Sequence, residues 1–423
     1  MMGLNLRLDF KLAQREEADT RMKEYLVKTV EGFFDTYPER KVRSLILTGG
    51  MSRGEGSCEL SSGGALIYSD YDLLVVPKDR KDVAEARSLF PVMSRSVTDS
   101  LRGEEFCSHV DFAPFTTDYL KNMSPSMFNV ELAEHGKVVW GDDETLSQIE
   151  KPDASEIPLD DALTLLFNRI AAQLVMIDPL RESEGAEFEF AFYHNGKIFL
   201  DIVSCILVLE HNYRPTYAER LSALLQSSDG VASRLQGLLE EARFWTYYKL
   251  DPNKNRVREK YSPGNVAAGS SVVAVKIWNL LVPKMEQTLG LCLEEAFGVK
   301  DYPLDSALIT FLRRKNVLRR LREYRTFLHR AAPAIKKGRI RPLPFFMRGT
   351  PLDMTYAAAT MLFFSVDRLG RDSVVLRNGQ RTGQAALFLP VVVPFSGKAE
   401  DWWEELREAT TELWRVIVKG GAY

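Results

Sequence analysis

Two short apolar runs near the N-terminus constrain the fold more than any other feature of this sequence. Residues 43–48 (RSLILT) end at Gly49-Gly50, and residues 72–76 (DLLVV) end at Pro77. Apolar runs of about four to eight residues that end at glycine or proline are typical of buried strands. The sequence therefore predicts at least two strands inside the first hundred residues.

The segments around these runs predict a unit in which strands and helices alternate. Apolar residues recur with the helical period over residues 13–36, and residues 79–102 also have a helical pattern. Residues 106–112 and 137–140 are predicted as further strands. We therefore expect an α/β domain with a mixed sheet over residues 1–150.

The character of the chain changes at residues 151–158 (KPDASEIP), a polar linker bounded by prolines. We expect a helical domain over 159–350 and a mostly helical region over 351–423. The apolar run 385–395 contains two prolines, is too short to cross a bilayer and is predicted to be buried. Helical patterns cover residues 159–176, 196–212, 217–248 with a break near Asp229-Gly230, 268–297, 355–369 and 398–419.

Composition favours a reduced, cytoplasmic protein. The first residues lack the apolar core of a signal peptide, and no run of about 18 consecutive apolar residues predicts a membrane span. The four cysteines lie far apart without a CxxC pair, and the five histidines lack metal-ligand spacing, so neither a disulfide framework nor a zinc site is indicated.

Charge is divided unevenly along the chain. Residues 313–348 contain thirteen Lys or Arg and one acid, Glu323, a local net charge of +12. The overall charge of -3 therefore leaves -15 for the other 387 residues. With its interleaved aromatic residues, this basic segment suits an anionic partner such as nucleic acid or a phosphorylated carrier. A solvated helix, or one paired with the protein's own acids, is an equally good interpretation.

Two carboxylates carry the strongest chemical signal. Asp70 and Asp72 are two residues apart at the beginning of a predicted strand, so both side chains point to the same side. A hard cation such as Mg²⁺ is the usual reason to hold neighbouring carboxylates together. The turn after the first strand, with Gly49, Gly50 and Ser52, offers backbone N–H groups that can cradle phosphate.

This arrangement resembles the DNA polymerase β-like nucleotidyltransferase superfamily. The motifs that carry the resemblance occur in order over residues 40–142: GGMSRGE at 49–55, SDYDLL at 69–74, HVDFAPF at 109–115 and HGKVVWG at 135–141. The version in bacterial nitrogen-regulatory protein uridylyltransferases is the most similar. A weaker resemblance to the helical domain of antibiotic nucleotidyltransferases covers residues 166–169, 196–201 and 213–220.

The resemblance implies Mg²⁺-dependent attack of a hydroxyl on the α-phosphorus of an NTP, with release of pyrophosphate. Asp70 and Asp72 would hold two Mg²⁺ ions, or Mn²⁺, and Asp111 would complete the site and act as or orient the base. Arg169 and Lys197 would neutralise triphosphate charge. For Lys197 a helical pair with Asp201 is an equal alternative.

The sequence departs from the family pattern in two places. Gly50 replaces a serine that many members use on the triphosphate, so Ser52 or Arg53 would supply that contact. Thirteen residues separate Glu55 from Ser69, and residues 58–67 are expected to form a hairpin or a lid. Glu55 could equally cap a helix or touch metal.

Three functions follow from these patterns. The first is transfer of a nucleoside monophosphate to a hydroxyl of a small molecule, sugar or protein. The second is template-independent addition of nucleotides to RNA through the basic segment. The third, from a different class, is a non-catalytic nucleotide-binding or antitoxin-like protein that keeps the fold without the reaction.

Overall fold

The computed structural model divides the chain into two compact units. The first contains Met1–Asp161 and Ile206–Lys254, and the second contains Ala162–Cys205 and Asn255–Tyr423. The chain thus leaves the first unit at Asp161 and returns to it at Ile206. The structure describes residues 4–61, 64–102, 108–182, 186–227, 230–235, 237–264, 270–298, 303–330, 339–370, 374–377, 379–395 and 397–418.

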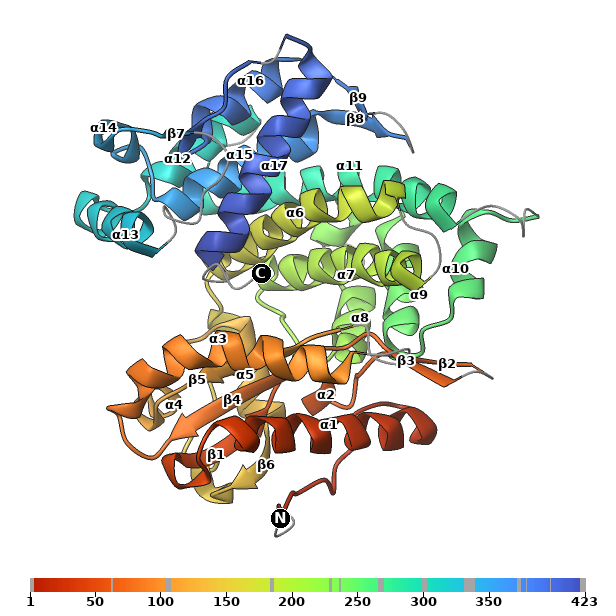
Figure 1. Ribbon diagram of the computed structural model, residues 1–423. Coiled ribbons are helices and arrows are strands. Elements are labelled where there is room, and N and C mark those ends of the chain that lie inside the picture. Colours follow the sequence, from red (N-terminus) through yellow and green to blue (C-terminus); the bar gives the residue numbers. More distant parts are fainter. Residues whose placement is uncertain are drawn as a thin grey trace. The chain divides into compact units, whose positions relative to one another are not determined.

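The first unit is built on a four-stranded mixed sheet (Figure 1). Its strands are β1 (Val42–Leu47), β4 (Tyr71–Pro77), β5 (Val110–Pro114) and β6 (Lys137–Gly141), in the order β5-β4-β1-β6. Strand β1 is antiparallel to β4 and β6, whereas β4 and β5 are parallel. The mixed sheet predicted for this region is therefore present. The predicted strand 106–112 begins only at Val110, and residues 103–107 lie outside the described ranges.

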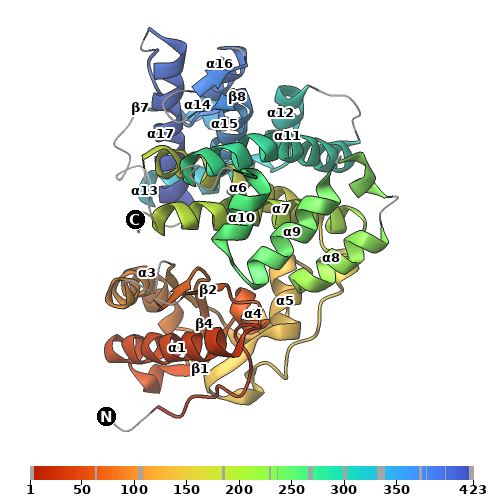
Figure 2. The ribbon, with the colours of Figure 1, turned by 90° about the vertical axis from the view of Figure 1, so that its right-hand side faces the viewer.

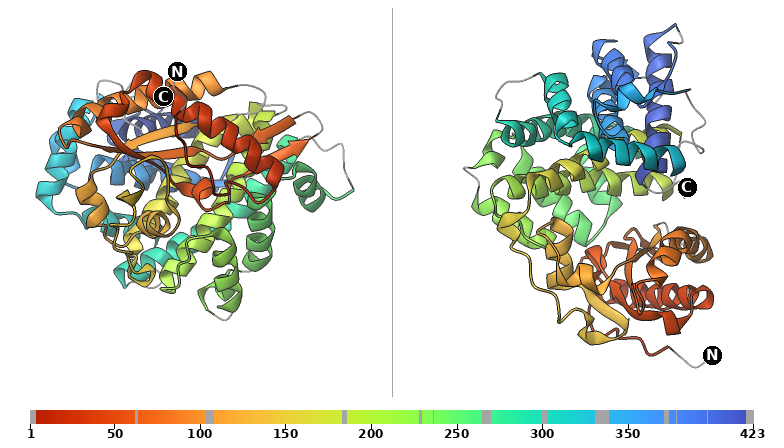
Figure 3. Two further views of the ribbon diagram at one scale, coloured as in Figure 1. Left: turned by 90° about the horizontal axis from the view of Figure 1, so that it is seen from below. Right: turned by 90° about the vertical axis from the view of Figure 1, so that its left-hand side faces the viewer.

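Helices cover both faces of this sheet, as the apolar runs require. Leu45 and Leu47 face one core with α1 (Glu16–Thr36) and α3 (Asp82–Leu101), whereas Ile46 between them faces a second core. The second core contains Leu120 of α4 (Thr117–Lys121) and Leu132 of α5 (Met127–His135). Seen from below, α1 (red) lies in front of the strands (Figure 3).

The stretch 58–67 forms the predicted hairpin. Strands β2 (Cys58–Ser61) and β3 (Gly64–Ile67) pair antiparallel, with Cys58 opposite Ile67. The hairpin leads directly to the Asp-x-Asp motif. Cys58, Ala65 and Ile67 are buried in the core beside α1.

Two helices from the second half of the chain complete the first unit. They are α8 (Tyr217–Gln226) and α9 (Leu238–Leu250), after the last turn of α7 (Ala186–Leu209). Helix α8 begins with a capping box in which Thr216 and Glu219 exchange hydrogen bonds. The helical pattern over 217–248 is thus divided in two, and the gap is wider than the predicted break.

The second unit is helical and centres on α15 (Pro351–Ser365). Fourteen of its residues are buried, and it packs against α11 (Ser270–Phe297), α12 (Leu304–Arg313) and α13 (Val317–Arg330). Helices α15, α16 (Gly379–Phe388) and α17 (Ala399–Val418) also pack against one another (Figures 2 and 3). The second unit also contains all or most of four further helices: α6 (Leu159–Glu182), α7, α10 (Lys254–Tyr261) and α14 (Leu343–Phe346).

Two predictions for the C-terminal region are wrong in detail. The helix predicted over 355–369 ends at Ser365, and Val366–Leu369 forms strand β8, paired with β9 (Val374–Leu376). The run 385–395 is only partly buried, since Leu387 and Phe395 are 61% and 59% exposed. Its residues Val391–Val392 form β10, an edge strand paired with β7 (Arg339–Ile340), so alternate side chains face solvent.

One helical segment of the described residues is long and apolar enough to cross a membrane. It is Phe192–Leu209 of α7, with a mean hydropathy of 1.4, and 83% of this segment is buried inside the protein. It also contains Lys197 and Asp201. Burial of this kind is typical of a core helix.

Candidate active site

The fold brings the three predicted carboxylates to one edge of the sheet. Asp72 of β4 and Asp111 of β5 are register partners on parallel strands, and Asp70 lies two residues before Asp72. Register partners on parallel strands direct their side chains to the same face. The Asp111 side chain is 55% exposed and that of Asp70 is 25% exposed, so a ligand can reach both.

His109 lies between two of these carboxylates. Its Nδ1 is 3.0 Å from Oδ1 of Asp70, and its Nε2 is 3.1 Å from Oδ2 of Asp111. The charge of Asp70, together with hydrogen bonds to both acids, raises the pKa of His109 to about 10, although burial acts in the opposite direction. An imidazolium therefore holds Asp70 and Asp111 at neutral pH. Asp70 also accepts a hydrogen bond from Ser108 Oγ.

Sequence reasoning missed this histidine because it searched for zinc spacing. The available signal was its position two residues before Asp111, which places both side chains on one face of a strand. Among the described residues, no group of three His, Cys, Asp or Glu side chains stands ready to hold a metal ion. Asp70 and Asp111 are instead in contact with His109.

The glycine turn predicted after β1, which the structure folds as the short helix α2 (Gly49–Ser52), packs against the third carboxylate. Thr48 N–H donates to the Asp72 carbonyl at 2.9 Å, and Gly49 follows with a positive φ of 71°. A Cβ on Gly49 would lie 2.7 Å from Oδ2 of Asp72, closer than side chains tolerate. Glycine thus suits the left-handed backbone at position 49, and a side chain there would displace the Asp72 carboxylate. Ser52 is buried, and its Oγ donates to the Gly49 carbonyl at 3.0 Å.

Arg53 and Glu55, which end the glycine motif, are bound within the first unit. Arg53 Nε is 3.0 Å from Glu55 Oε2, and its guanidinium also contacts Glu131 of α5. Glu55 Oε1 accepts the backbone N–H of Tyr217 at 2.7 Å, at the beginning of α8. Of the two roles considered for Glu55, the structure shows the helix cap. Arg53 is 3% exposed and engaged by two carboxylates.

Glu131 is the centre of this buried charge network. It accepts hydrogen bonds from Tyr213 Oη at 2.5 Å and from the guanidiniums of Arg53 and Arg220. Burial raises the pKa of Glu131, but the two arginines outweigh it and the net shift is downward. Residues 213–220, noted in the sequence, thus attach α8 to the glycine turn.

Lys249 of α9 brings a buried cation to the same turn. It is 4% exposed, and its Nζ donates to Ser57 Oγ at 2.8 Å and to Ser69 Oγ at 3.1 Å. The same Nζ lies 3.5 Å from the position that a Cβ on Gly50 would occupy. A side chain at position 50 would therefore meet the ammonium group. No local motif marks Lys249, which reaches the turn only because α9 folds onto it.

The two cations assigned to triphosphate by the resemblance lie in the second unit. Arg169 Nε is 2.5 Å from Oδ2 of Asp201, and both side chains are largely buried. Lys197 lies over the ring of Tyr193, with Nζ 5.6 Å from its centroid. Asp201, the alternative partner of Lys197, is thus engaged by Arg169.

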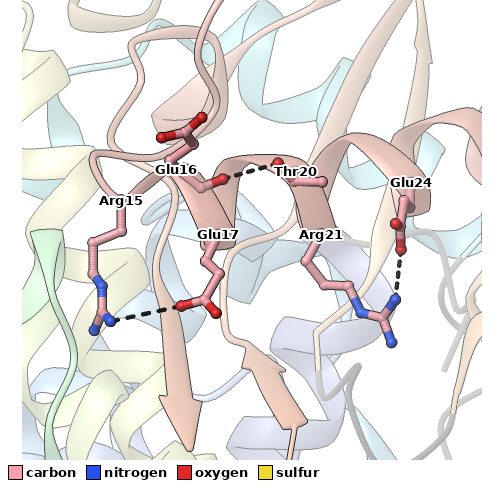
Figure 4. A pocket seen from close by; sticks show the side chains of 6 residues that line it. All are labelled: Arg15, Glu16, Glu17, Thr20, Arg21 and Glu24. Atoms are coloured by element: carbon pink, nitrogen blue, oxygen red, sulfur yellow. Dashed lines mark hydrogen bonds and ion pairs between the residues drawn. The ribbon is translucent and has the colours of Figure 1, made fainter.

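Two cavities lined by described residues lie away from the carboxylates. One, of about 580 Å³, is an open depression along the first turns of α1, where Arg21 and Glu24 form an ion pair at 2.6 Å (Figure 4). Another, of about 480 Å³, lies at the opposite end of β1 beside Arg43 and Asp142, which are themselves paired at 2.9 Å. Each depression contains an ion pair between its own lining residues, and neither brings together a set of carboxylates like that of Asp70, Asp72 and Asp111.

Comparisons with family models, with curated proteins and with solved structures find no match, so the functional argument depends on this geometry.

Proposed function

We propose that this protein is a Mg²⁺-dependent nucleotidyltransferase, which transfers a nucleoside monophosphate from an NTP to a hydroxyl group and releases pyrophosphate. One observation carries the proposal. Asp72 and Asp111, 39 positions apart in the sequence, are register partners at the edge where Asp70 and the Gly49-Gly50 turn also lie. Three acids beside a glycine turn combine the chemistry needed for metal and for phosphate.

The donor set fits a hard cation. All three predicted ligands are carboxylates, and Mg²⁺ prefers oxygen ligands while it leaves positions for substrate phosphates. Asp70 and Asp72 would hold two ions and Asp111 would complete one of the sites. Bound there, Mg²⁺ or Mn²⁺ would supply Lewis-acid stabilisation of the attacking and leaving oxygens.

Phosphate recognition is assigned to the turn and to Lys249. The glycine turn presents backbone N–H groups, and the Lys249 ammonium lies beside Gly50, the position where many family members have serine. Ser57 and Ser69 hold this ammonium in place. Ser52 and Arg53 receive a structural role here, because their polar atoms are bound to the turn and to Glu55 and Glu131.

Proton transfer is assigned to Asp111. Its carboxylate is the most exposed of the three predicted ligands, and an acceptor hydroxyl can approach it from solvent. His109 orients this carboxylate through its hydrogen bond at 3.1 Å. The acceptor is a hydroxyl compound, with small molecules, sugars and proteins as the classes to be tested.

The test uses α-labelled ATP, CTP, GTP and UTP in turn, with Mg²⁺ and cell extract as the source of acceptor. We expect label transfer and pyrophosphate release with the native protein and neither with Asp70→Asn. Asp118→Asn is the matched control, since this exposed acid lies on α4 with 71% of its side chain in solvent. Equal activity of native protein and Asp70→Asn with every nucleotide would refute the proposal.

A second candidate function is a non-catalytic nucleotide-binding protein. The specific observation in its favour is the imidazolium of His109 between Asp70 and Asp111, which offsets one of their two negative charges without a metal. Such a protein would bind NTP in the presence of EDTA and leave it intact. Calorimetry with and without EDTA, followed by chromatography of the nucleotide, separates the two candidates.

A further inference from the structure

Helix α13, in the second unit, presents aliphatic side chains to solvent. Leu318 is 78% exposed, Val317 is 43% exposed, and Leu321 and Leu328 are each 38% exposed. Leu321 and Leu328 are seven residues apart and therefore lie along one line of the helix. Soluble proteins expose single apolar residues routinely, but four on one fourteen-residue helix form a continuous surface.

Cations share this outward face with the leucines. Arg322 and Arg325 are exposed, and no carboxylate among the described residues pairs with either. Both lie within one turn of Leu318 or Leu321. Helix α13 contains five arginines and a single acid, Glu323, which is already bound by Arg319 at 3.0 Å. The outward face is therefore both aliphatic and cationic.

Other cations of the basic segment 313–348 are used within the unit. Lys315 Nζ lies 3.0 Å from Oδ2 of the buried Asp353, and Arg314 is 3.6 Å from the same carboxylate. Arg320 is buried and donates to the carbonyls of Arg313 and Met347. Part of the segment is thus structural, whereas Arg322 and Arg325 of α13 stay exposed.

The aromatic residues that suggested nucleic acid are mostly used for packing. Phe327 and Phe346 are 4% and 1% exposed, and Tyr324 packs on Phe346 with ring centroids 4.2 Å apart. The ring of Phe345 lies beneath the guanidiniums of Arg341 and Arg348. Stacking on free aromatic faces is what single-stranded nucleic acid requires. The exposed apolar groups are aliphatic instead.

We propose that α13 is an interfacial helix that docks on an anionic lipid bilayer. Leu318, Leu321 and Leu328 would enter the boundary between headgroups and acyl chains, while Arg322 and Arg325 would contact lipid phosphates. Helices with leucines and arginines in this combination lie in the plane of the interface, and their binding increases with apolar area and with anionic lipid. Charge complementarity selects this occupant, because a second copy of the cationic helix would be repelled.

Helix α3 also exposes aliphatic residues beside arginines, but it lacks the net positive charge of α13. It exposes Leu89 (39%) and Val92 (66%) together with Arg87 and Arg95. Three acids accompany its two arginines, so its net charge is -1 rather than the +4 of α13. It therefore provides matched control positions within the same protein.

The test is co-sedimentation of the full chain with vesicles of phosphatidylcholine, alone or partly replaced by phosphatidylglycerol. We expect binding only to the anionic vesicles, weakened at least about tenfold by Arg322→Glu/Arg325→Glu and by high salt. Leu318→Gln/Leu321→Gln should also weaken binding, because insertion contributes beyond charge. Thermal melting confirms that each variant is folded.

Control variants and one competing partner complete the design. Arg87→Glu/Arg95→Glu and Leu89→Gln/Val92→Gln on α3 should leave vesicle binding unchanged. The proposal is overturned if anionic vesicles fail to bind the native chain, or if the α3 variants lose as much binding as the α13 variants. It is also overturned if single-stranded RNA, and not vesicles, binds in a manner that requires Arg322 and Arg325.

Discussion

Asp72 and Asp111 stand opposite each other in the register of two parallel strands. The chain between them contains α3, the crossover that parallel strands require. Because the crossover returns β5 beside β4, Asp111 lies next to the Asp-x-Asp pair although 39 positions separate it from Asp72. This relationship is what turns three separate motifs into one candidate site.

The first prediction concerns these acids. Asp72→Asn and Asp111→Asn should each lower nucleotidyl transfer by about 10³-fold or more, since metal stabilisation of developing charge contributes several kcal/mol. Label transfer from the preferred NTP measures the loss. Melting temperatures should stay close to the native value, because the Asp111 side chain is half-exposed. A variant that retains native activity would remove that acid from the site.

The second prediction separates two effects at Gly49: its left-handed backbone conformation and the closeness of the Asp72 side chain. Gly49 and Gly264 have φ values of +71° and +75°, but only at Gly49 would a Cβ meet Asp72, whereas no described residue lies within 4 Å of a Cβ at Gly264. Alanine at either position costs roughly 1 kcal/mol or more in a left-handed conformation. Gly49→Ala should lower the melting temperature further and also weaken Mn²⁺ binding in calorimetry. Equal behaviour of the two variants would show that contact with Asp72 is unimportant.

Local patterns in the sequence predicted much of the first unit. Strands β1 and β4 follow from short apolar runs, α1 from its period, and the hairpin at 58–67 from its glycines, because each signal lies within the element itself. The acids of the site were likewise placed on the correct strands. Val366–Leu369 was assigned to a helix because an apolar stretch beside a helix carries no mark of the strand β9 that pairs with it.

Contacts between distant residues could not be predicted. Lys249 reaches Ser57 across 192 positions, and Glu131 reaches Arg220 across 89. Neither pair has a spacing that a linear pattern reveals, and each depends on residues 206–254 folding onto the N-terminal sheet. The sequence suggested Arg53 as a phosphate contact because its two carboxylate partners, Glu55 and Glu131, are visible only in three dimensions.

The third prediction tests Lys249 as a phosphate contact. Lys249→Met preserves most of the buried aliphatic volume but removes the ammonium beside Gly50. We expect NTP affinity to fall about tenfold to a hundredfold, with a smaller effect on the nucleoside, because a charge-assisted bond to phosphate is worth about 1.5–3 kcal/mol. Calorimetry with NTP and with nucleoside measures both. Equal affinity of native and variant protein for NTP would exclude this role.

The last prediction concerns Glu131 and acid. Arg53 and Arg220 lower its pKa despite the opposing effect of burial, so the ionised carboxylate is favoured by folding. A carboxyl whose pKa is lower in the folded state contributes stability at neutral pH, fully present above its ordinary pKa of 4.5. That contribution is lost as the pH falls below 4.5 toward the folded-state value.

Glu131→Gln should therefore destabilise the protein at neutral pH by about 3–5 kcal/mol, because it removes the carboxylate that the buried Arg53 and Arg220 share. The variant should also lose less of its remaining stability than the native protein when the pH is lowered through this range. Melting temperatures across the acid range measure both effects. Glu134→Gln, on the exposed side of the same helix, is the control. If Glu134→Gln changed the acid dependence as much as Glu131→Gln, the buried network would not be its source.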